Sequence, residues 1–278
     1  MEKYRASATS LGVAGLRAAH QLLDNEPLLL YDPIILQLLG PSWRAHLREH
    51  PEPYLRPEIM HLRSHVVLRS RWAEDRLNLA YQEGIRQYLL LGAGLDTFAW
   101  RQPIGMEDLR VFELDHPATQ AQKLQDLTNQ GFLIPDNLRF VPADLEVVSL
   151  REVLDLYAFD LSQPCFVSWL GVMVYLSMEA IDEVLSFVAS LPAGSRMVFT
   201  FTAKKEAGAE SVIGARAAAL GEPWKSFFSP EEIEERLRGL GFSSIEFLQP
   251  EEARRLYFSG RTDALPAPRN VSICEARI

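Results

Sequence analysis

The chain has 278 residues, of which 47% are hydrophobic and 23% are charged, and its formal net charge is -9. This composition is ordinary for a globular enzyme with one large domain, or with a core domain and a small lobe. No apolar run is long enough to cross a bilayer, and the acidic balance argues against nucleic acid as a partner. Cys165 and Cys274 lie in apolar strand patterns, which predicts buried thiols in a reducing compartment and a cytoplasmic protein.

The first eighty or so residues are predicted to form helices separated by loops. One helix is expected at residues 11–23. A second opens at Asp32-Pro33 and stops at Gly40-Pro41, because proline suits a first helical turn and glycine a helix end. A third is expected at residues 58–82. We therefore expect an N-terminal helical cap over residues 1–83 and a second domain over residues 84–278.

The second domain alternates strands and helices, which predicts a mostly parallel sheet with helices on both faces and ligands at the carboxyl ends of its strands. Residues 203–228, here called the lid segment, are rich in Ala and Gly and have a helical pattern. We expect the lid segment and the N-terminal helices together to cover the active site. A further helix begins at Ser229-Pro230. The expected strands, of which the last two close the sheet in a hairpin-like arrangement, lie near residues 87–92, 109–114, 137–141, 164–169, 195–202, 243–248 and 270–276.

The most informative stretch is the end of the first strand, which runs into Gly92-Ala93-Gly94 and then into a predicted helix capped by Asp96. Glycines there permit a sharp turn and let a ligand lie against the backbone. The second strand ends in acidic residues, placed to bind the ribose hydroxyls of a nucleotide. We expect Glu113 to be that ligand and Asp115 to orient the loop. The two strand ends together predict a nucleoside-cofactor site.

The residue at the third glycine position distinguishes between cofactors. The dinucleotide fingerprint needs a glycine there, but this chain has Thr97, preceded by Asp96. An acidic side chain beside the loop would repel a pyrophosphate and suits a cationic ligand. The pattern therefore favours S-adenosylmethionine over NAD. An NAD-linked oxidoreductase would also be expected to carry a catalytic Tyr-x-x-x-Lys or a similar pair, and the sequence has none.

Several motifs in order resemble the leucine carboxyl methyltransferase family, and most closely its bacterial branch of S-adenosylmethionine-dependent O-methyltransferases. The resemblance implies a class I methyltransferase fold, which is Rossmann-like with a seven-stranded sheet, and it extends over nearly the whole chain. The segments that carry it are 91–97, 99–101, 112–117 with Lys123, and also 28–33, 69–75, 142–145 and 168–176.

The resemblance also implies roles for single residues. Arg69 would bind the methionyl carboxylate of the cofactor, and the alternative, which the resemblance makes less favoured, is a solvated arginine on a helix face. Asp144 would accept the adenine amino group while Leu145 packs on the ring; the alternative for Asp144 is a helix cap. Trp169 would flank the sulfonium. The remaining cofactor-binding residues that we expect are Gly92, Ala93, Gly94, Asp96, Glu113 and Leu114.

The expected activity is methylation of a carboxylate or hydroxyl of a small molecule. The alternatives are a protein C-terminal carboxyl methyltransferase and a cofactor-binding protein without turnover. Many family members carry a glutamate where this chain has Leu170, which weakens the case for a protein substrate. Leu170, Met173, Tyr175 and Trp224 are expected to line the acceptor pocket, Tyr175 being equally well explained as a core tyrosine.

No residue is identified as a catalytic base. His116 lies nearest a cofactor motif, but a His-Pro pair at a helix start is more often structural. His61 and His65 are one helical turn apart, a spacing that also occurs in metal sites, but no third ligand accompanies them, so no metal is expected. The weak case for a base favours a carboxylate acceptor, which is already ionised at neutral pH. The acceptor and the oligomeric state are left open.

Overall fold

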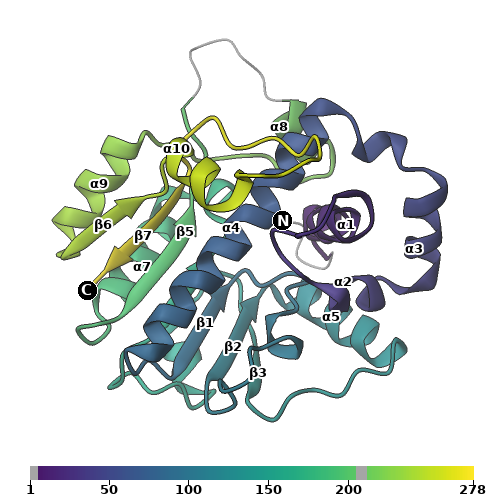
Figure 1. The fold of residues 1–278 in the computed structure, drawn as a ribbon. Coiled ribbons are helices and arrows are strands. Elements are labelled where there is room, and N and C mark those ends of the chain that lie inside the picture. The colour runs from purple at the N-terminus through teal and green to yellow at the C-terminus, as the bar shows by residue number, and fades with distance from the viewer. Residues whose placement is uncertain (1–5, 205–211) are drawn as a thin grey trace.

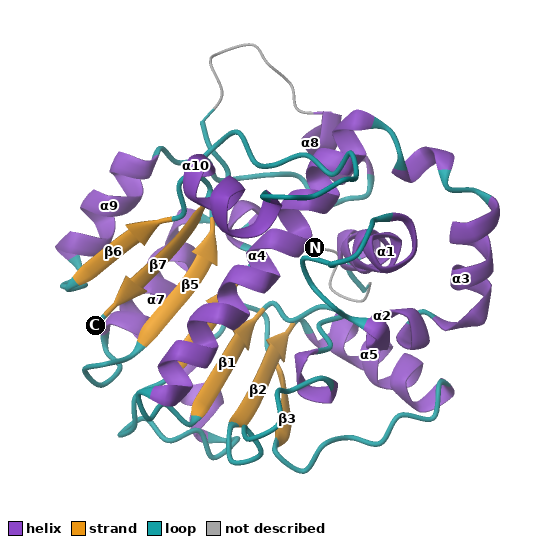
Figure 2. Cartoon of the chain, in the orientation of Figure 1, coloured by secondary structure: helices purple, strands orange, loops and turns teal. Residues whose placement is uncertain are grey.

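A computed structural model describes residues 6–204 and 212–278 and contains a seven-stranded sheet with helices on both faces (Figures 1 and 2). The strand order is β3-β2-β1-β4-β5-β7-β6, and all neighbours are parallel except those of β7. The predicted fold class, with its closing antiparallel pair, is confirmed. The strands are β1 Gln87–Leu91, β2 Arg110–Asp115, β3 Leu138–Pro142, β4 Phe166–Trp169, β5 Arg196–Thr200, β6 Ser244–Phe247 and β7 Ile273–Arg277.

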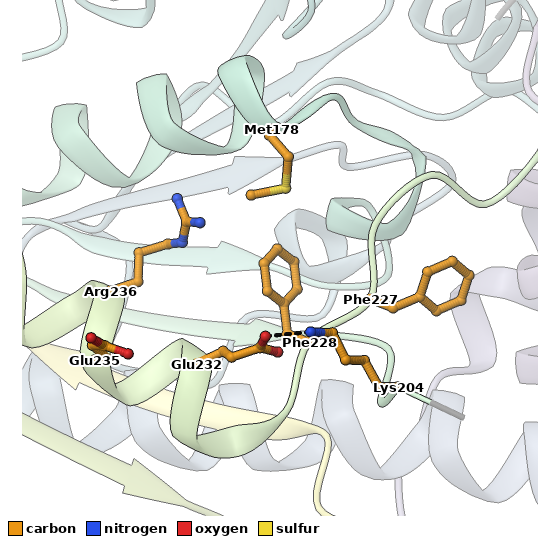
Figure 3. A pocket seen from close by; sticks show the side chains of 7 residues that line it. All are labelled: Met178, Lys204, Phe227, Phe228, Glu232, Glu235 and Arg236. Carbon is orange, nitrogen blue, oxygen red and sulfur yellow. Dashed lines mark hydrogen bonds and ion pairs between the residues drawn. The ribbon is translucent and has the colours of Figure 1, made fainter. Parts of the chain in front are cut away.

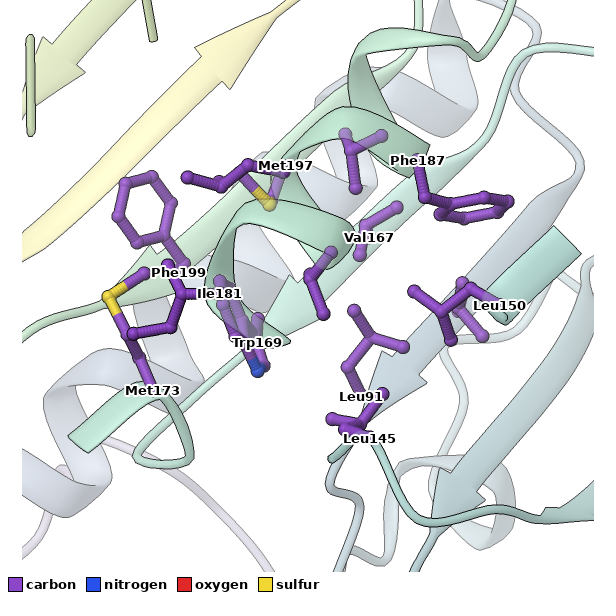
Figure 4. Close-up of a cluster of buried hydrophobic side chains, with 14 of the residues drawn as sticks. Leu91, Leu145, Leu150, Val167, Trp169, Met173, Ile181, Phe187, Met197 and Phe199 are labelled. Atoms are coloured by element: carbon purple, nitrogen blue, oxygen red, sulfur yellow. The ribbon is translucent and has the colours of Figure 1, made fainter. Parts of the chain in front are cut away.

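The two faces of the sheet bury alternate residues of each strand. On β1, Leu89 and Leu91 belong to a buried cluster that also contains side chains of α6 (Leu150–Asp155), α7 (Met178–Ala189) and α9 (Pro230–Gly239). Tyr88 and Leu90 face the opposite way, into a cluster shared with the helix α4 (Pro57–Gln82). Because both faces are covered, the central strands are mainly apolar, as is typical of parallel sheets. Figure 4 shows part of the first cluster.

The N-terminal helices α1 (Ala8–Leu23), α2 (Pro33–Leu38) and α3 (Gly40–Glu49) form a third buried cluster beside the sheet. The stop predicted at Gly40-Pro41 is also a start: Gly40, at φ +82°, ends the turn after α2, and Pro41 occupies the first turn of α3. The long helix α4 was assigned to the cap from sequence, but its buried side chains belong to the same cluster as those of β1.

The prediction of a helix after the glycine turn is wrong, because the structure has only a 3-10 turn there, η2, at Phe98–Trp100. Asp96 still caps this turn by accepting a hydrogen bond from the Phe98 backbone N–H at 2.7 Å. The chain then passes through Pro103 and Gly105 to β2. Proline and glycine disfavour continuation of a helix.

The lid segment is only partly helical among the described residues. Helix α8 covers Val212–Ala219, and an extended stretch then leads to Phe228, which pairs with Ala203 in an isolated parallel bridge. Residues 205–211 lie outside the described part of the chain. The helix predicted to begin at Ser229 is α9, whose capping box joins Ser229 and Glu232. The remaining elements are η1 Glu52–Tyr54, α5 Pro117–Asn129, η3 Met173–Tyr175, α10 Pro250–Ala253 and η4 Arg254–Phe258.

None of the helices described by the structure combines the length and the apolar character that crossing a membrane requires. Cys165 and Cys274 are both free and buried, as the sequence predicted, and burial raises the pKa of each thiol.

Candidate active site

A cavity of about 750 Å³ opens at the carboxyl ends of the parallel strands. In Figure 1 these strand ends point towards α1 and α8, and residues of both helices line the cavity. Its walls therefore combine strand ends with helices that are far away in sequence. A cavity at the strand carboxyl ends is where the sequence placed the ligand.

The glycine turn forms the floor of the cavity. Gly92 and Gly94 have φ values of +68° and +54°, a region that favours glycine. The backbone N–H groups of Gly92 and Ala93 both donate to the Leu114 carbonyl, at 2.8 and 3.1 Å. A Cβ on Gly92 would lie 2.2 Å from a methyl carbon of Val172, so the turn admits no larger residue there. The turn is thus fixed against the end of β2.

Asp115, rather than Glu113, is the acidic residue of β2 that lines the cavity. Its carboxylate accepts hydrogen bonds from the backbone N–H groups of Gly94 and His116. Burial nevertheless outweighs these bonds and raises the pKa of Asp115. The residue thus holds the glycine turn, as the sequence suggested, and also presents a carboxyl group to the cavity.

Glu113 lies below the floor of the cavity and is 1% exposed. Its carboxylate pairs with Lys123 of α5, whose ammonium group also donates to the Asp96 carbonyl at 2.7 Å. Burial raises the pKa of Glu113 to about 7, although Lys123 opposes the shift. The structure therefore gives Glu113 a partner from within the protein and does not bring it to the cavity.

Arg69 comes from α4 and lies at the cavity wall against the loop after β4. A Cβ built on Gly171 would lie 2.3 Å from its guanidinium nitrogen Nη1, so the guanidinium lies over that glycine. Burial, with a smaller contribution from Arg17, lowers the pKa of Arg69 to about 10, while Tyr175 acts in the opposite direction. Within residues 6–204 and 212–278 no carboxylate pairs with Arg69, and it remains a cation at neutral pH.

Asp96 and Thr97 belong to a buried network that anchors the helices to the glycine turn. Arg17 of α1 contacts Asp32 at 2.6 Å and Asp96 at 3.1 Å. Thr97, at the third glycine position, donates to Asp32 at 2.8 Å and accepts from Arg101 at 2.9 Å. Burial would raise the pKa of Asp96, but Arg17 and Arg101 outweigh it and lower that pKa. Both residues therefore have structural partners, and Asp96 also lines the cavity, whereas Thr97 is fully buried.

Asp144 and Leu145 line the cavity beyond β3, as expected. Asp144 also accepts a hydrogen bond from the Glu146 backbone N–H at 3.1 Å, and so caps the short turn that follows β3. His116 lies between them and α5: its Nδ1 accepts from the Ala118 N–H at 3.3 Å, and its Nε2 is 3.8 Å from an Asp144 oxygen. The expected structural role of His116 at the start of α5 is thus present.

At the end of β4 the side chains alternate in direction. Ser168 and Leu170 line the cavity, whereas Trp169 is fully buried on the other face of the sheet. Met173 is buried in the same cluster as Trp169, as Figure 4 shows. Tyr175 is half-buried and lines the cavity, and its hydroxyl has no hydrogen-bond partner among the described residues, so its surroundings are not those of a core tyrosine.

The part of the cavity away from the glycine turn is formed by helices and by the extended stretch after α8. From this region, sequence reasoning named Trp224 for the acceptor pocket, and it named His65 only for its spacing from His61. The indole Nε1 of Trp224 is buried and has no hydrogen-bond partner among the described residues. No motif marks the other residues, which come from distant segments whose sequence pattern is that of ordinary amphipathic helices. They include Trp43, His46, Tyr54, His65, Ile213 and Arg216.

A second, open pocket of about 420 Å³ lies between α7 and α9 (Figure 3). It is lined by Phe227 and Phe228, so these two aromatic residues of the lid segment do not face the main cavity. The ion pair between Lys204 and Glu232 crosses its rim. Across the described residues, no three His, Cys, Asp or Glu side chains gather closely enough to hold a metal ion, and this includes His61 and His65.

Comparison with known proteins agrees with this geometry. Residues 10–189 match the family model for leucine carboxyl methyltransferase. A protein of Bacillus subtilis named "Putative S-adenosyl-L-methionine-dependent methyltransferase YktD" is 35% identical over 96% of this chain and 96% of its own length. A protein of the same description from Mycobacteroides abscessus is 30% identical, covering 92% of this chain and 80% of the relative.

Two solved structures share the fold at 18% sequence identity. One is a methyltransferase-type protein from Thermobifida fusca, with a TM-score of 0.58 and coverage of 99% of this chain and 96% of the other. The second is a DUF574 family protein from Streptomyces avermitilis, with a TM-score of 0.56 and coverage of 94% and 96%.

The fold, the glycine turn and these relatives together define an S-adenosylmethionine-dependent methyltransferase. This chain belongs to the leucine carboxyl methyltransferase family, and S-adenosylmethionine is its cofactor.

Proposed function

We propose that this enzyme methylates a carboxylate oxygen of a small-molecule acceptor bound in the helical part of the main cavity. The observation that carries the proposal is the arrangement of that cavity. At one side it presents Arg69, which has no anionic partner among the described residues, and at the other a mainly apolar region built largely from helices. The first suits the carboxylate end of the cofactor, and the second leaves room for an organic acceptor.

The lining residues fit the cofactor group by group. Arg69 offers a planar, charged donor to the methionyl carboxylate, the pairing for which a guanidinium is best suited. We place the ribose hydroxyls at Asp115 in preference to Glu113, because Asp115 lines the cavity and Glu113 is paired with Lys123. Asp144 and Leu145 would hold the adenine edge and face. Gly92, Ala93 and Gly94 would pass beneath the ligand.

The bound cofactor supplies an electrophilic methyl group on a sulfonium, so methyl transfer requires no nucleophile from the protein. The protein's contribution is to hold donor and acceptor in line and to exclude water, and positioning alone is worth roughly 7–11 kcal/mol in well-oriented intramolecular reactions. Leu170 and Val172 place apolar surface at the strand ends where the two ligands would meet. Water exclusion there strengthens the electrostatic interactions of the site.

The protonation of the cavity residues favours a carboxylate acceptor over a phenol. A phenol has a pKa of about 10 and must lose a proton to a base, whereas a carboxylic acid is already ionised at neutral pH. His65 is the histidine nearest Arg69, one turn away on α4. Burial, aided by the charge of Arg69, lowers its pKa to about 3, which makes it a poor proton acceptor. Among the cavity histidines that the structure describes, only His116 lies near a carboxylate, that of Asp144, and His116 caps α5.

An acceptor screen with labelled cofactor tests this proposal. Matched compounds that share one apolar ring skeleton and differ in bearing a carboxylate, a phenol or an amine would be offered to the purified enzyme. Peptides with a free or an amidated C-terminus would test the protein-substrate alternative. We expect label in a base-labile ester of the acid only. Transfer confined to phenols or amines would contradict the carboxylate proposal, and transfer confined to the free-acid peptide would favour a protein acceptor.

A further inference from the structure

Glu222 joins the turn after α8 to the first turn of α1. Its side chain is nearly buried, the residue being 8% exposed. The carboxylate accepts from the Ala8 backbone N–H at 2.8 Å, from the Ser7 hydroxyl at 3.0 Å and from the Thr9 hydroxyl. Free N–H groups at a helix start are unsatisfied within the helix and carry partial positive charge, so a carboxylate there is doubly favourable.

The same turn of α1 also contacts the cofactor side of the cavity. The Ser7 backbone N–H donates to the Thr119 hydroxyl of α5 at 3.1 Å. A Cβ on Gly94 would lie 2.6 Å from the Ser10 hydroxyl, so this turn lies directly against the glycine turn. The Ser10 hydroxyl is buried and has no hydrogen-bond partner among the described residues. The first turn of α1 thus covers the part of the cavity that is assigned to the cofactor.

Glu222 itself lies between residues assigned to the acceptor. Leu220, Pro223 and Trp224, its neighbours along the chain, line the helical part of the cavity. One carboxylate therefore connects the wall over the cofactor with the wall around the acceptor. When the contact breaks, both walls lose a common support.

We propose that Glu222 is a positioning residue, and that its contact with Ser7, Ala8 and Thr9 must open for the cofactor to enter or leave. Cofactor bound beneath α1 favours the closed contact, and the closed contact holds the acceptor wall in place. The cofactor then binds before the acceptor, and the demethylated product leaves after the contact has opened. This inference rests on the proposed placement of the cofactor in the main cavity.

The test measures the dissociation rate of S-adenosylhomocysteine from the whole protein, by stopped-flow fluorescence with excess S-adenosylmethionine as competitor. Hydrogen bonds to a charged group contribute enough that Glu222→Ala is expected to speed release by about tenfold to a hundredfold. Glu222→Gln, which keeps one acceptor oxygen, should fall between. Glu234→Ala is the matched control, because Glu234 is a solvated partner of Arg238 on α9, away from the cavity.

A double-mutant cycle across the contact distinguishes a specific role of the Glu222 contact from a general loss of stability. Thr9→Val removes a donor from the α1 side, and its effect should not add to that of Glu222→Ala because both break one contact. A wild-type dissociation rate in Glu222→Ala, or an equal acceleration in Glu234→Ala, would overturn the inference. Failure of the cofactor placement has a different signature: Arg69→Met would then bind S-adenosylhomocysteine as tightly as the wild type.

Discussion

Arg69 and Arg71 lie two residues apart on α4 but have different surroundings. Arg71 is partly exposed and pairs with Asp75 at 2.9 Å, as a helix-face arginine does. Arg69 faces the cavity and keeps its charge without a carboxylate partner among the described residues. A buried cation without an anion is costly, and a ligand carboxylate would offset that cost.

Replacing Arg69 by Met should weaken binding of S-adenosylhomocysteine by about tenfold to a hundredfold, because a charge-assisted bidentate contact is lost. Calorimetric titration measures the change in Kd. Arg71→Met should leave Kd unchanged, and equal losses in both variants would contradict the assignment. Because the pKa of Arg69 is about 10, wild-type affinity should hold at neutral pH and fall only as the pH approaches that value.

The sequence predicts which residue types form the site more readily than it predicts which of their side chains face the cavity. Glu113 and Asp115 are two apart and face the same side of β2, so an acidic strand end was foreseeable. Which of them reaches the cavity depends on where β2 ends and on Lys123, a partner ten residues away. The burial of Trp169 follows from strand alternation once Ser168 is known to face the cavity.

At the scale of elements, the loop after β4 and the helix α4 fit together through a glycine. Gly171 has a φ of +75°, its N–H donates to the Thr200 hydroxyl at 2.7 Å, and the Arg69 guanidinium covers the position of a Cβ. A Cβ at residue 171 would displace the guanidinium of Arg69, which is the flexible end of a side chain. The fold can therefore accommodate an alanine at this position, but Arg69 cannot keep its place.

We therefore expect Gly171→Ala to retain the fold but to weaken cofactor binding severalfold or more. The left-handed backbone conformation adds a stability cost of roughly 1–2 kcal/mol. Thermal unfolding and cofactor titration together separate the two effects. Gly239→Ala at the end of α9 meets no atom within 4 Å and is the tolerated control. A Gly171→Ala enzyme with normal cofactor affinity would show that Arg69 need not lie over this glycine.

Elements with strong periodicity or caps were predictable, and those decided by tertiary contacts were not. The seven strands and α9 follow from apolar runs and from the Ser229-Pro230 start. The helix expected after Gly94 did not form, since Asp96 is engaged by Arg17 of α1 and the chain soon meets Pro103. Apart from Trp224, the individual residues of the acceptor wall could not be predicted, because they come from η1, α3, α4 and α8, each of which has an ordinary helical sequence.

For the molecule as a whole, Glu113 links stability to pH. Its pKa is raised to about 7 in the folded state, while an unfolded glutamate titrates near 4.3. The folded chain therefore binds more protons between these values. The stabilising contribution of Glu113 to the free energy of unfolding is complete below its pKa in the unfolded chain. This contribution is lost as the pH rises through its pKa in the folded protein.

The free energy of unfolding of the wild type should accordingly fall between pH 5 and pH 8 relative to Glu113→Gln, by up to about 3 kcal/mol. Urea denaturation of both proteins without cofactor measures this difference. Glutamine is close in shape and cannot ionise, so it serves as the matched reference. A difference that stays constant across the range would mean that Glu113 titrates at its ordinary value in the folded protein.

The charge network of Arg17, Asp32, Asp96 and Arg101 has a consequence for exchange of parts between relatives. The network joins α1 to the segment after the glycine turn, so the charged residues on each side have their partners on the other side. A chimera that took its helices from one homologue and its sheet from another would leave charged side chains unpaired in the interior, unless all four residues came from the same parent.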